Sequence, residues 1–169
     1  MRLKFALIAP FALALSACGA ETSGTLTGEE GEEGEEGEYT INRETGETTA
    51  TIETEEGTAT LRSGSNVPVD LPAGFTLYPG AEVVTNTVVQ LGGGSGVLLT
   101  MSSEDSPEEV AEFYKAQAQN AGIAIEMDMA VNGGKIVGGE APSGLTFSIM
   151  ATPQGRATSA QLTVGNQPD

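Results

Sequence analysis

The chain has 169 residues, with 24 Asp and Glu against 7 Lys and Arg, a formal net charge of -17, no His and 1 Cys. This length is typical of about one domain. Without His, the chain lacks the imidazole of a Ser-His-Asp or Cys-His catalytic group and of a histidine metal site. One Cys makes neither an internal disulfide nor a zinc or iron–sulfur cage. The excess of acids disfavours nucleic acid, which is bound mainly through Lys and Arg.

Residues 1–17 have the pattern of a lipoprotein signal peptide. Arg2 and Lys4 precede an uncharged, mainly apolar run over 5–18, which is shorter than the roughly 20 residues of a membrane-spanning helix. The run ends in Leu15-Ser16-Ala17-Cys18, which resembles the lipobox of bacterial lipoproteins. The resemblance implies cleavage before Cys18 and lipidation of Cys18 by chains such as palmitate, which would anchor the protein in a membrane. Gly19, in place of an Asp that retains many lipoproteins in the inner membrane, favours the periplasmic face of the outer membrane.

Residues 18–38 are acidic and of low complexity. From Gly28 to Glu38 the sequence repeats Gly-Glu-Glu without Pro, which excludes a collagen helix. The segment offers little apolar surface to offset the entropy lost on ordering, so we expect a disordered, lipid-anchored linker. The repeat also lacks the fixed loop geometry of a calcium site. We therefore expect the linker to act as a spacer that holds the folded part clear of the membrane.

Residues 39–65 predict a small β unit. Three Thr-rich segments alternate in polarity, and Gly46 and Gly57 fall where turns would separate them, as in a short antiparallel meander. Its apolar set is small: Tyr39, Ile41, Ala50, Ile52, Ala59 and Leu61. Such a unit is marginal alone, so it either docks on the main domain or stays mobile.

Residues 66–169 are long enough to bury a core. The pattern predicts strands over 82–91, 97–102, 123–129, 135–137, 145–151 and 157–164. Alternation would place Ile123, Ile125, Met127 and Met129 on one face of their strand. The glycine clusters at 92–96 and 133–134 lack the Gly-Lys-Ser/Thr of a phosphate-binding loop, so they are interpreted as turns.

A helix is predicted over 107–121. Ser106 and Glu109 have the spacing of a capping box, and Pro107 suits the first helical position. Helical spacing places Val110, Phe113, Tyr114, Gln117 and Ala121 on one face. The predicted fold class is therefore α+β: an antiparallel sheet with one helix packed on a face (β-β-α-β-β-β-β), preceded by a disordered acidic linker and a small β unit.

Several motifs of this segment resemble small envelope lipoproteins of Gram-negative bacteria. These motifs are Leu71-Pro72-Ala73-Gly74-Phe75, Leu77-Tyr78-Pro79-Gly80-Ala81, and Ser106-Pro107-Glu108-Glu109-Val110 with Phe113-Tyr114-Lys115. In such proteins a YPGA turn precedes an SPEEV…FYK helix and a β-meander. The motifs are turns, caps and a helix face. The resemblance thus implies an envelope location and an α+β fold, and it transfers no active site.

The leading functional interpretation is a non-enzymatic, lipid-anchored, periplasm-facing interaction or structural domain, with another envelope protein as a candidate partner. One helix covers one sheet face, so the apolar residues of the other face, such as Val84, Val88, Leu98 and Met150, need the 39–62 segment or a partner to cover them. An alternative is a small-molecule-binding lipoprotein with its ligand between helix and sheet, and a third is a hydrolase that uses carboxylates alone.

The predicted site residues reduce to Cys18 as the lipidation site, with no catalytic, cofactor or metal residue. The methionines at 101, 127, 129 and 150 raise the question of Cu(I), which thioethers bind. No His or free Cys accompanies them, so ordinary core packing is the preferred interpretation. We accordingly expect no cofactor, no nucleic acid, and a membrane contact through lipidated Cys18.

Overall fold

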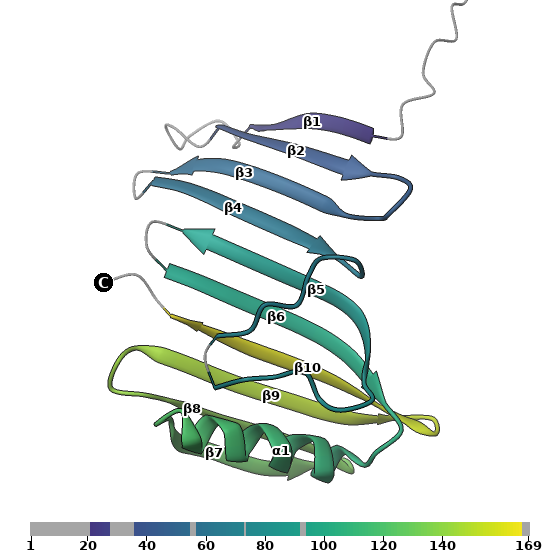
Figure 1. Cartoon of the computed structure of the whole chain (residues 1–169), viewed down its shortest axis with the longest axis vertical. Helices are drawn as coiled ribbons and strands as arrows, with labels where there is room; N and C mark the ends of the chain where they lie inside the picture. Colours follow the sequence, from purple (N-terminus) through teal and green to yellow (C-terminus); the bar gives the residue numbers. More distant parts are fainter. Residues whose placement is uncertain (1–20, 28–35, 55–56, 73, 92–93, 167–169) are drawn as a thin grey trace, which may run out of the picture.

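The computed structural model describes residues 21–27, 36–54, 57–72, 74–91 and 94–166. Its strands form one antiparallel sheet in the order β1-β2-β3-β4-β5-β6-β10-β9-β8-β7 (Figure 1). The strands are β1 (Glu21–Thr27), β2 (Glu36–Asn42), β3 (Thr48–Thr54), β4 (Gly57–Gly64), β5 (Glu82–Leu91), β6 (Gly94–Ser103), β7 (Ala124–Val131), β8 (Gly134–Glu140), β9 (Leu145–Gln154) and β10 (Ala157–Asn166). The single described helix is α1 (Pro107–Asn120).

The predicted α+β class is wrong, because the molecule is mostly β. After residue 66 the elements follow in the expected order, with β5 and β6 before α1 and β7 to β10 after it. However, β4 pairs with β5 from Ala59↔Leu91 to Gly64↔Asn86, so the expected separate β unit is part of the same sheet. One helix of 14 residues therefore accompanies a sheet of 10 strands.

The segment expected to be a linker also contributes to the sheet. Residues 21–27 form β1, the edge strand, and residues 36–38 begin β2. Gly24 lies opposite Tyr39, and a Cβ on Gly24 would come within 2.6 Å of the Tyr39 ring. An aromatic ring over a cross-strand glycine fixes the pairing of an edge strand with little apolar surface of its own. The expected linker over 18–38 is thereby interrupted by a strand, and residues 28–35 lie outside the described part of the chain.

The helix begins as its capping pattern predicts. The Ser106 hydroxyl accepts from the backbone N–H of Glu109 at 3.3 Å, and the backbone N–H of Ser106 donates to the Glu109 carboxylate at 3.1 Å. Hydrogen bonds from Ser106 lower the pKa of Glu109, so the cap keeps its charge at neutral pH. The helix buries Val110, Ala111, Tyr114 and Ala118 against β7 to β10.

The core lies on one side of the sheet, which we call the covered face. The helix packs over β7 to β10, and the segment 65–81 crosses β5, β6 and β10 (Figure 1). Gln117 ties the two together, since its amide accepts from the Thr76 N–H at 3.0 Å and donates to the Thr76 hydroxyl at 2.9 Å. Every member of the buried apolar cluster falls between Phe75 and Val164. The strands β1 to β4 thus extend the sheet beyond the core.

A β-bulge changes the direction of the side chains in β7. The register with β8 shifts between Ile125 and Met127, so one extra residue reverses the alternation. Ile123 and Ile125 pack with the core, whereas Met127 and Met129 are exposed on the opposite side. The predicted common face of these four residues is therefore wrong, and the reason is the bulge.

Candidate functional site

The one predicted site residue, Cys18, lies outside the described residues. Within the described residues, none of the helices has the length and apolar character needed to cross a membrane. Two other features of the described chain are candidate binding sites: the sheet face opposite α1 and a pocket beside the segment 65–81.

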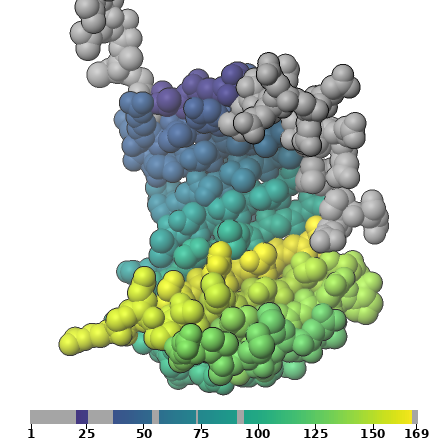
Figure 2. Space-filling view, turned by 180° about the vertical axis from the view of Figure 1, so that it is seen from behind, coloured from purple at the N-terminus to yellow at the C-terminus, as the bar shows by residue number. Residues whose placement is uncertain are grey.

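The face opposite α1, which we call the open face, spans the full width of the sheet. Figure 2 looks onto it, and the colours of successive strands follow one another as bands without a helix across them. Strand register defines its members. Leu61, Val89, Leu98 and Met150 belong to it, while their neighbours along each strand turn to the covered face.

The exposed apolar residues gather on this face. The large hydrophobics with exposed side chains are Ile41, Val84, Val89, Met127, Met129, Val131 and Met150. Register places all of them except Val84 on the open face, and Val84 sits in the bulge of β5. Scattered single hydrophobics are normal on a protein surface, but six of these seven on one face make that face a candidate interaction surface.

The open face also carries almost no charge, although the chain has a net charge of -17. For the described side chains, register assigns to it only Glu82, the first residue of β5, and Glu140, the last residue of β8; Glu126 sits in the bulge of β7. Between these ends the face consists of Thr, Ser, Gln, Gly and apolar residues. In β3 and β4 the charged residues Glu53 and Arg62 lie on the other side. The alternation thus sorts the charges away from the open face.

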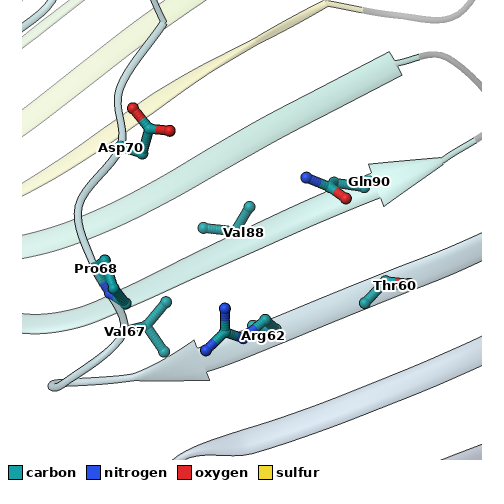
Figure 3. A pocket seen from close by; sticks show the side chains of 7 residues that line it. All are labelled: Thr60, Arg62, Val67, Pro68, Asp70, Val88 and Gln90. Carbon is teal, nitrogen blue, oxygen red and sulfur yellow. The ribbon is translucent and has the colours of Figure 1, made fainter.

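A pocket of about 300 Å³ lies on the covered face where the segment 65–81 meets β4 and β5 (Figure 3). Its walls are Thr60, Arg62, Val67, Pro68, Asp70, Val88 and Gln90. It is an open cleft of mixed character, with one cation, one anion and two hydrogen-bonding side chains around Val67, Val88 and Pro68. Thr60, Arg62 and Gln90 come from the strands β4 and β5, whereas Asp70 comes from the segment 65–81, which we call the crossing segment (Figure 3).

Hydrogen bonds hold the two sides of this pocket in place. The Arg62 guanidinium donates twice to Glu47 Oε1, at 3.1 and 2.7 Å, which fixes its position on β4. The buried Asn86 amide donates to the carbonyl of Pro68 at 2.8 Å and so fastens the crossing segment to β5. Asn86 Oδ1 is buried without a hydrogen-bond partner in the described chain. These contacts make the cleft a preformed feature of the fold.

The carboxylates near α1 have structural partners. Asp128 accepts from Lys115 at 2.6 Å and from Lys135 at 2.7 Å, and Lys135 also contacts Glu108 at 3.3 Å. The two lysines lower the pKa of Asp128, with Lys115 the larger influence. The contribution of this cluster to stability is therefore present at neutral pH and is lost as the pH falls through the lowered pKa of Asp128. The cluster ties the helix to β7 and β8.

The described residues bring no cluster of metal ligands together, and two of their tyrosines have raised pKa values. No group of three or more Cys, Asp or Glu side chains in that part of the chain has a metal-binding arrangement. Burial raises the pKa of Tyr114 to about 12, and burial together with a hydrogen bond to Asp105 raises the pKa of Tyr78 to about 12. Both shifts move the phenols away from neutral pH, where a general acid or base works best.

The structure divides the residues that the sequence grouped together. Leu98 and Met150 lie on the open face as expected, but Val88 pairs with Val97 on the covered face. Met101 is buried under α1, where its sulfur accepts from the Tyr114 hydroxyl at 3.5 Å, so the methionines do not form one group. The 39–62 segment does not cover the open face; it widens it.

The helix–sheet interface proposed for a ligand is filled by side chains of α1, of which Val110, Ala111, Tyr114 and Ala118 are each 0% exposed.

Sequence reasoning missed the pocket and the extent of the open face. Arg62, Asp70 and Gln90 are far apart in the chain and belong to no motif, so no local pattern joins them. The bulge in β7 did have a sequence signal, the pair Gly138-Gly139 in the neighbouring strand β8. Glycines within strands often mark a bulge or a close approach of another backbone.

Comparison with known proteins gives one partial match. Residues 83–164, just under half of the chain, match a family model described as START domain-like. The matched region runs from β5 through α1 to β10 and so contains the helix and its part of the sheet. No curated protein matches the chain, and no solved structure does. The match is compatible with a ligand-binding domain without enzymatic chemistry.

Proposed function

We propose that the chain is a lipid-anchored, non-enzymatic binding domain on the periplasmic face of the bacterial envelope, most consistent with the outer membrane. Its contact surface is the open face of the sheet. The observation that carries this proposal is the gathering of exposed apolar residues on a face that is nearly free of charge, in a strongly acidic chain. The lipobox at Leu15-Ser16-Ala17-Cys18 supports the anchor, and the partial family match supports binding over catalysis.

The start of β1 bears on how such an anchor would hold the sheet. β1 begins at Glu21, three residues after Cys18, and three peptide units reach at most about 11 Å. A lipid on Cys18 would therefore keep the β1 edge close to the membrane surface. The long spacer expected between lipid and folded part is not needed in this arrangement, and the sheet would stand with β1 nearest the lipid and β7 farthest away.

The anchor is tested by replacing its cysteine. The Cys18→Ala variant should move from the membrane fraction to the soluble fraction, because the lipid would have no attachment site. Mass spectrometry of the mature wild-type protein should show added acyl chains on Cys18. Ser16→Ala is the matched control, since it keeps a small residue in the lipobox and should leave both results unchanged. If Cys18→Ala still partitions with membranes and the wild type carries no lipid mass, the anchor proposal is wrong.

Binding of a small molecule in the pocket of Figure 3 is a second candidate function. Arg62 and Asp70 would hold the opposite charges of a zwitterionic ligand, with Val67 and Val88 against its apolar part. The family match favours this candidate only in part, because it includes Val88 and Gln90 but not Arg62 or Asp70.

Thermal shifts with a panel of envelope metabolites test the pocket. A ligand at 100 times its Kd stabilises a protein by about 2.7 kcal/mol, which should raise the Tm by several degrees. Arg62→Gln and Asp70→Asn should abolish that shift, whereas Arg43→Gln, in the turn before β3, should retain it. A shift that survives both pocket variants would place the ligand elsewhere, and a panel without any shift would count against this candidate.

A further inference from the structure

We infer that the partner of the open face is a second copy of this chain, so that two sheets pack face to face into a symmetric sandwich. This inference rests on the proposed function, in which the open face is the contact surface. It goes further by naming the occupant.

The distribution of charge favours a copy over an unrelated partner. The chain has a net charge of -17 before cleavage, and cleavage before Cys18 would also remove the cations Arg2 and Lys4. Contact between two such acidic copies is therefore repulsive unless it excludes carboxylates. The open face is the surface on which the register places charged side chains only at strand ends. A face shaped for a basic partner would present carboxylates to it. The near absence of charge fits a partner whose contact face is also uncharged and whose other surfaces are acidic. A second copy of this chain has both properties.

The pattern across the face is also self-complementary. Apolar side chains occupy its two ends, Ile41, Leu61 and Val89 over β2 to β5 and Met127, Met129 and Met150 over β7 to β9. β6 and β10 lie between them and contribute mainly Thr, Ser and Gln side chains, with Leu98 as the exception and Gln161 near the middle. Consider a two-fold axis that lies between the two sheets and runs across their strands, in the direction of the strand order. Rotation about this axis places each strand opposite the same strand of the other copy. Apolar ends then meet apolar ends, and the mainly polar middle meets the same middle of the other copy, as an isologous interface requires.

The face is large enough for a stable dimer. Ten strands at a spacing of about 4.8 Å, each roughly 25 Å long, give a face of about 1,000 Å². A standard interface buries about 800 Å² on each partner, and two sheets commonly pack face to face about 10 Å apart. The same axis also keeps both β1 edges on one side, so two lipids on Cys18 could enter one membrane.

A bilayer is a poorer fit for the same surface. Proteins that lie on a membrane usually present aromatic residues with Lys and Arg near the headgroups. Among the described side chains, the register gives this face one aromatic, Tyr39, and no cation. The composition is therefore that of a sheet that meets another sheet.

A cysteine at Met150 tests the inference in native membranes that contain the full-length lipoprotein. Met150 is 41% exposed and lies midway along β9, so the axis brings it near its symmetry mate. A short bismaleimide should link Met150→Cys into a band of twice the monomer mass. Wild type and Gln119→Cys, on the exposed side of α1, should give no such band.

A charge pair at Gln161, opposite Met150 on β10, separates dimer contact from folding. In the Met150→Cys background, Gln161→Glu alone or Gln161→Lys alone should reduce the dimer band at least tenfold, because like charges meet at the axis. Co-expression of the two variants should restore the band through mixed dimers. Restoration cannot come from a misfolded chain, so it would support a second copy directly.

The other outcomes distinguish the inference from the function on which it rests. A cross-link to a protein of another mass, or a Met150→Cys thiol that is shielded from a bulky maleimide without cross-linking, would overturn the second copy and keep the open face as a contact surface. A thiol that is freely labelled in intact membranes and never cross-links would overturn both proposals.

Discussion

Replacing Tyr114 by phenylalanine should lower the free energy of unfolding by about 1–3 kcal/mol, which is the cost of leaving a buried polar group without its partner. The Tyr114 side chain is fully buried in the middle of α1. Its hydroxyl accepts from the backbone N–H of Tyr78 at 3.0 Å and donates to Met101 at 3.5 Å. Phenylalanine keeps the ring and removes the acceptor, so the amide of Tyr78 remains buried and unpaired. Tyr114→Ala should cost more, about 3–5 kcal/mol, because it also leaves a cavity.

Tyr39→Phe is the matched control, because it removes the same hydroxyl from a half-buried ring on β2. We expect its effect to stay within about 0.5 kcal/mol. Urea unfolding followed by circular dichroism measures both variants without relying on Trp, which the chain lacks. Equal values for Tyr114→Phe and Tyr39→Phe would show that the buried hydroxyl contributes nothing to stability.

The sequence was most informative where the structure depends on neighbours along the chain. Ser106, Pro107 and Glu109 specify the start of α1 within four residues, and the helix begins where they predict. The strands from β5 to β10 were expected near their observed positions, because alternation and glycine turns are also local signals. The lipobox is local as well, and lipidation of Cys18 stays a prediction until it is measured.

The sequence was least informative where the structure depends on long-range pairing. β4 joins β5 across the intervening segment 65–81, and no pattern within 39–65 distinguishes an edge-to-edge continuation from docking on a face. β1 has little apolar surface and is specified by Tyr39 over Gly24, a contact between two strands. The pocket likewise brings Arg62 of β4 beside Asp70 of the crossing segment. The α+β class failed for this reason: four added strands changed the balance of the fold.

The bulge in β7 leads to the second large expected effect, that of Gly139→Ala. A Cβ on Gly139 would overlap the carbonyl oxygen of Ala124 and would lie 3.1 Å from Cα of Ile125. Both are backbone atoms of the neighbouring strand, next to the position where its register shifts. The strand must therefore move away or change its register. Overpacking of this kind typically costs about 1–3 kcal/mol, and backbone displacement can raise the cost further.

Gly138→Ala supplies a control one residue away in the same strand. A Cβ on Gly138 would meet the Met127 methyl and the Phe147 carbonyl at 3.4 Å, which is ordinary contact. Neither glycine has a positive φ, so the two substitutions differ in space and not in backbone strain. We expect Gly138→Ala to change the unfolding free energy by less than about 1 kcal/mol, in part because alanine restricts the unfolded chain.

Urea unfolding compares the two variants, and hydrogen exchange of the β7 amides shows where the change occurs. Gly139→Ala should speed exchange in β7 and β8 and leave β3 and β4 unchanged. Since the bulge directs Met127 and Met129 onto the open face, the folded fraction of Gly139→Ala should also give less of the dimer cross-link at Met150→Cys. Equal stability and equal exchange in the two alanine variants would mean that the close approach at Gly139 does not constrain β7. The bulge would then not be what places the methionines on the open face.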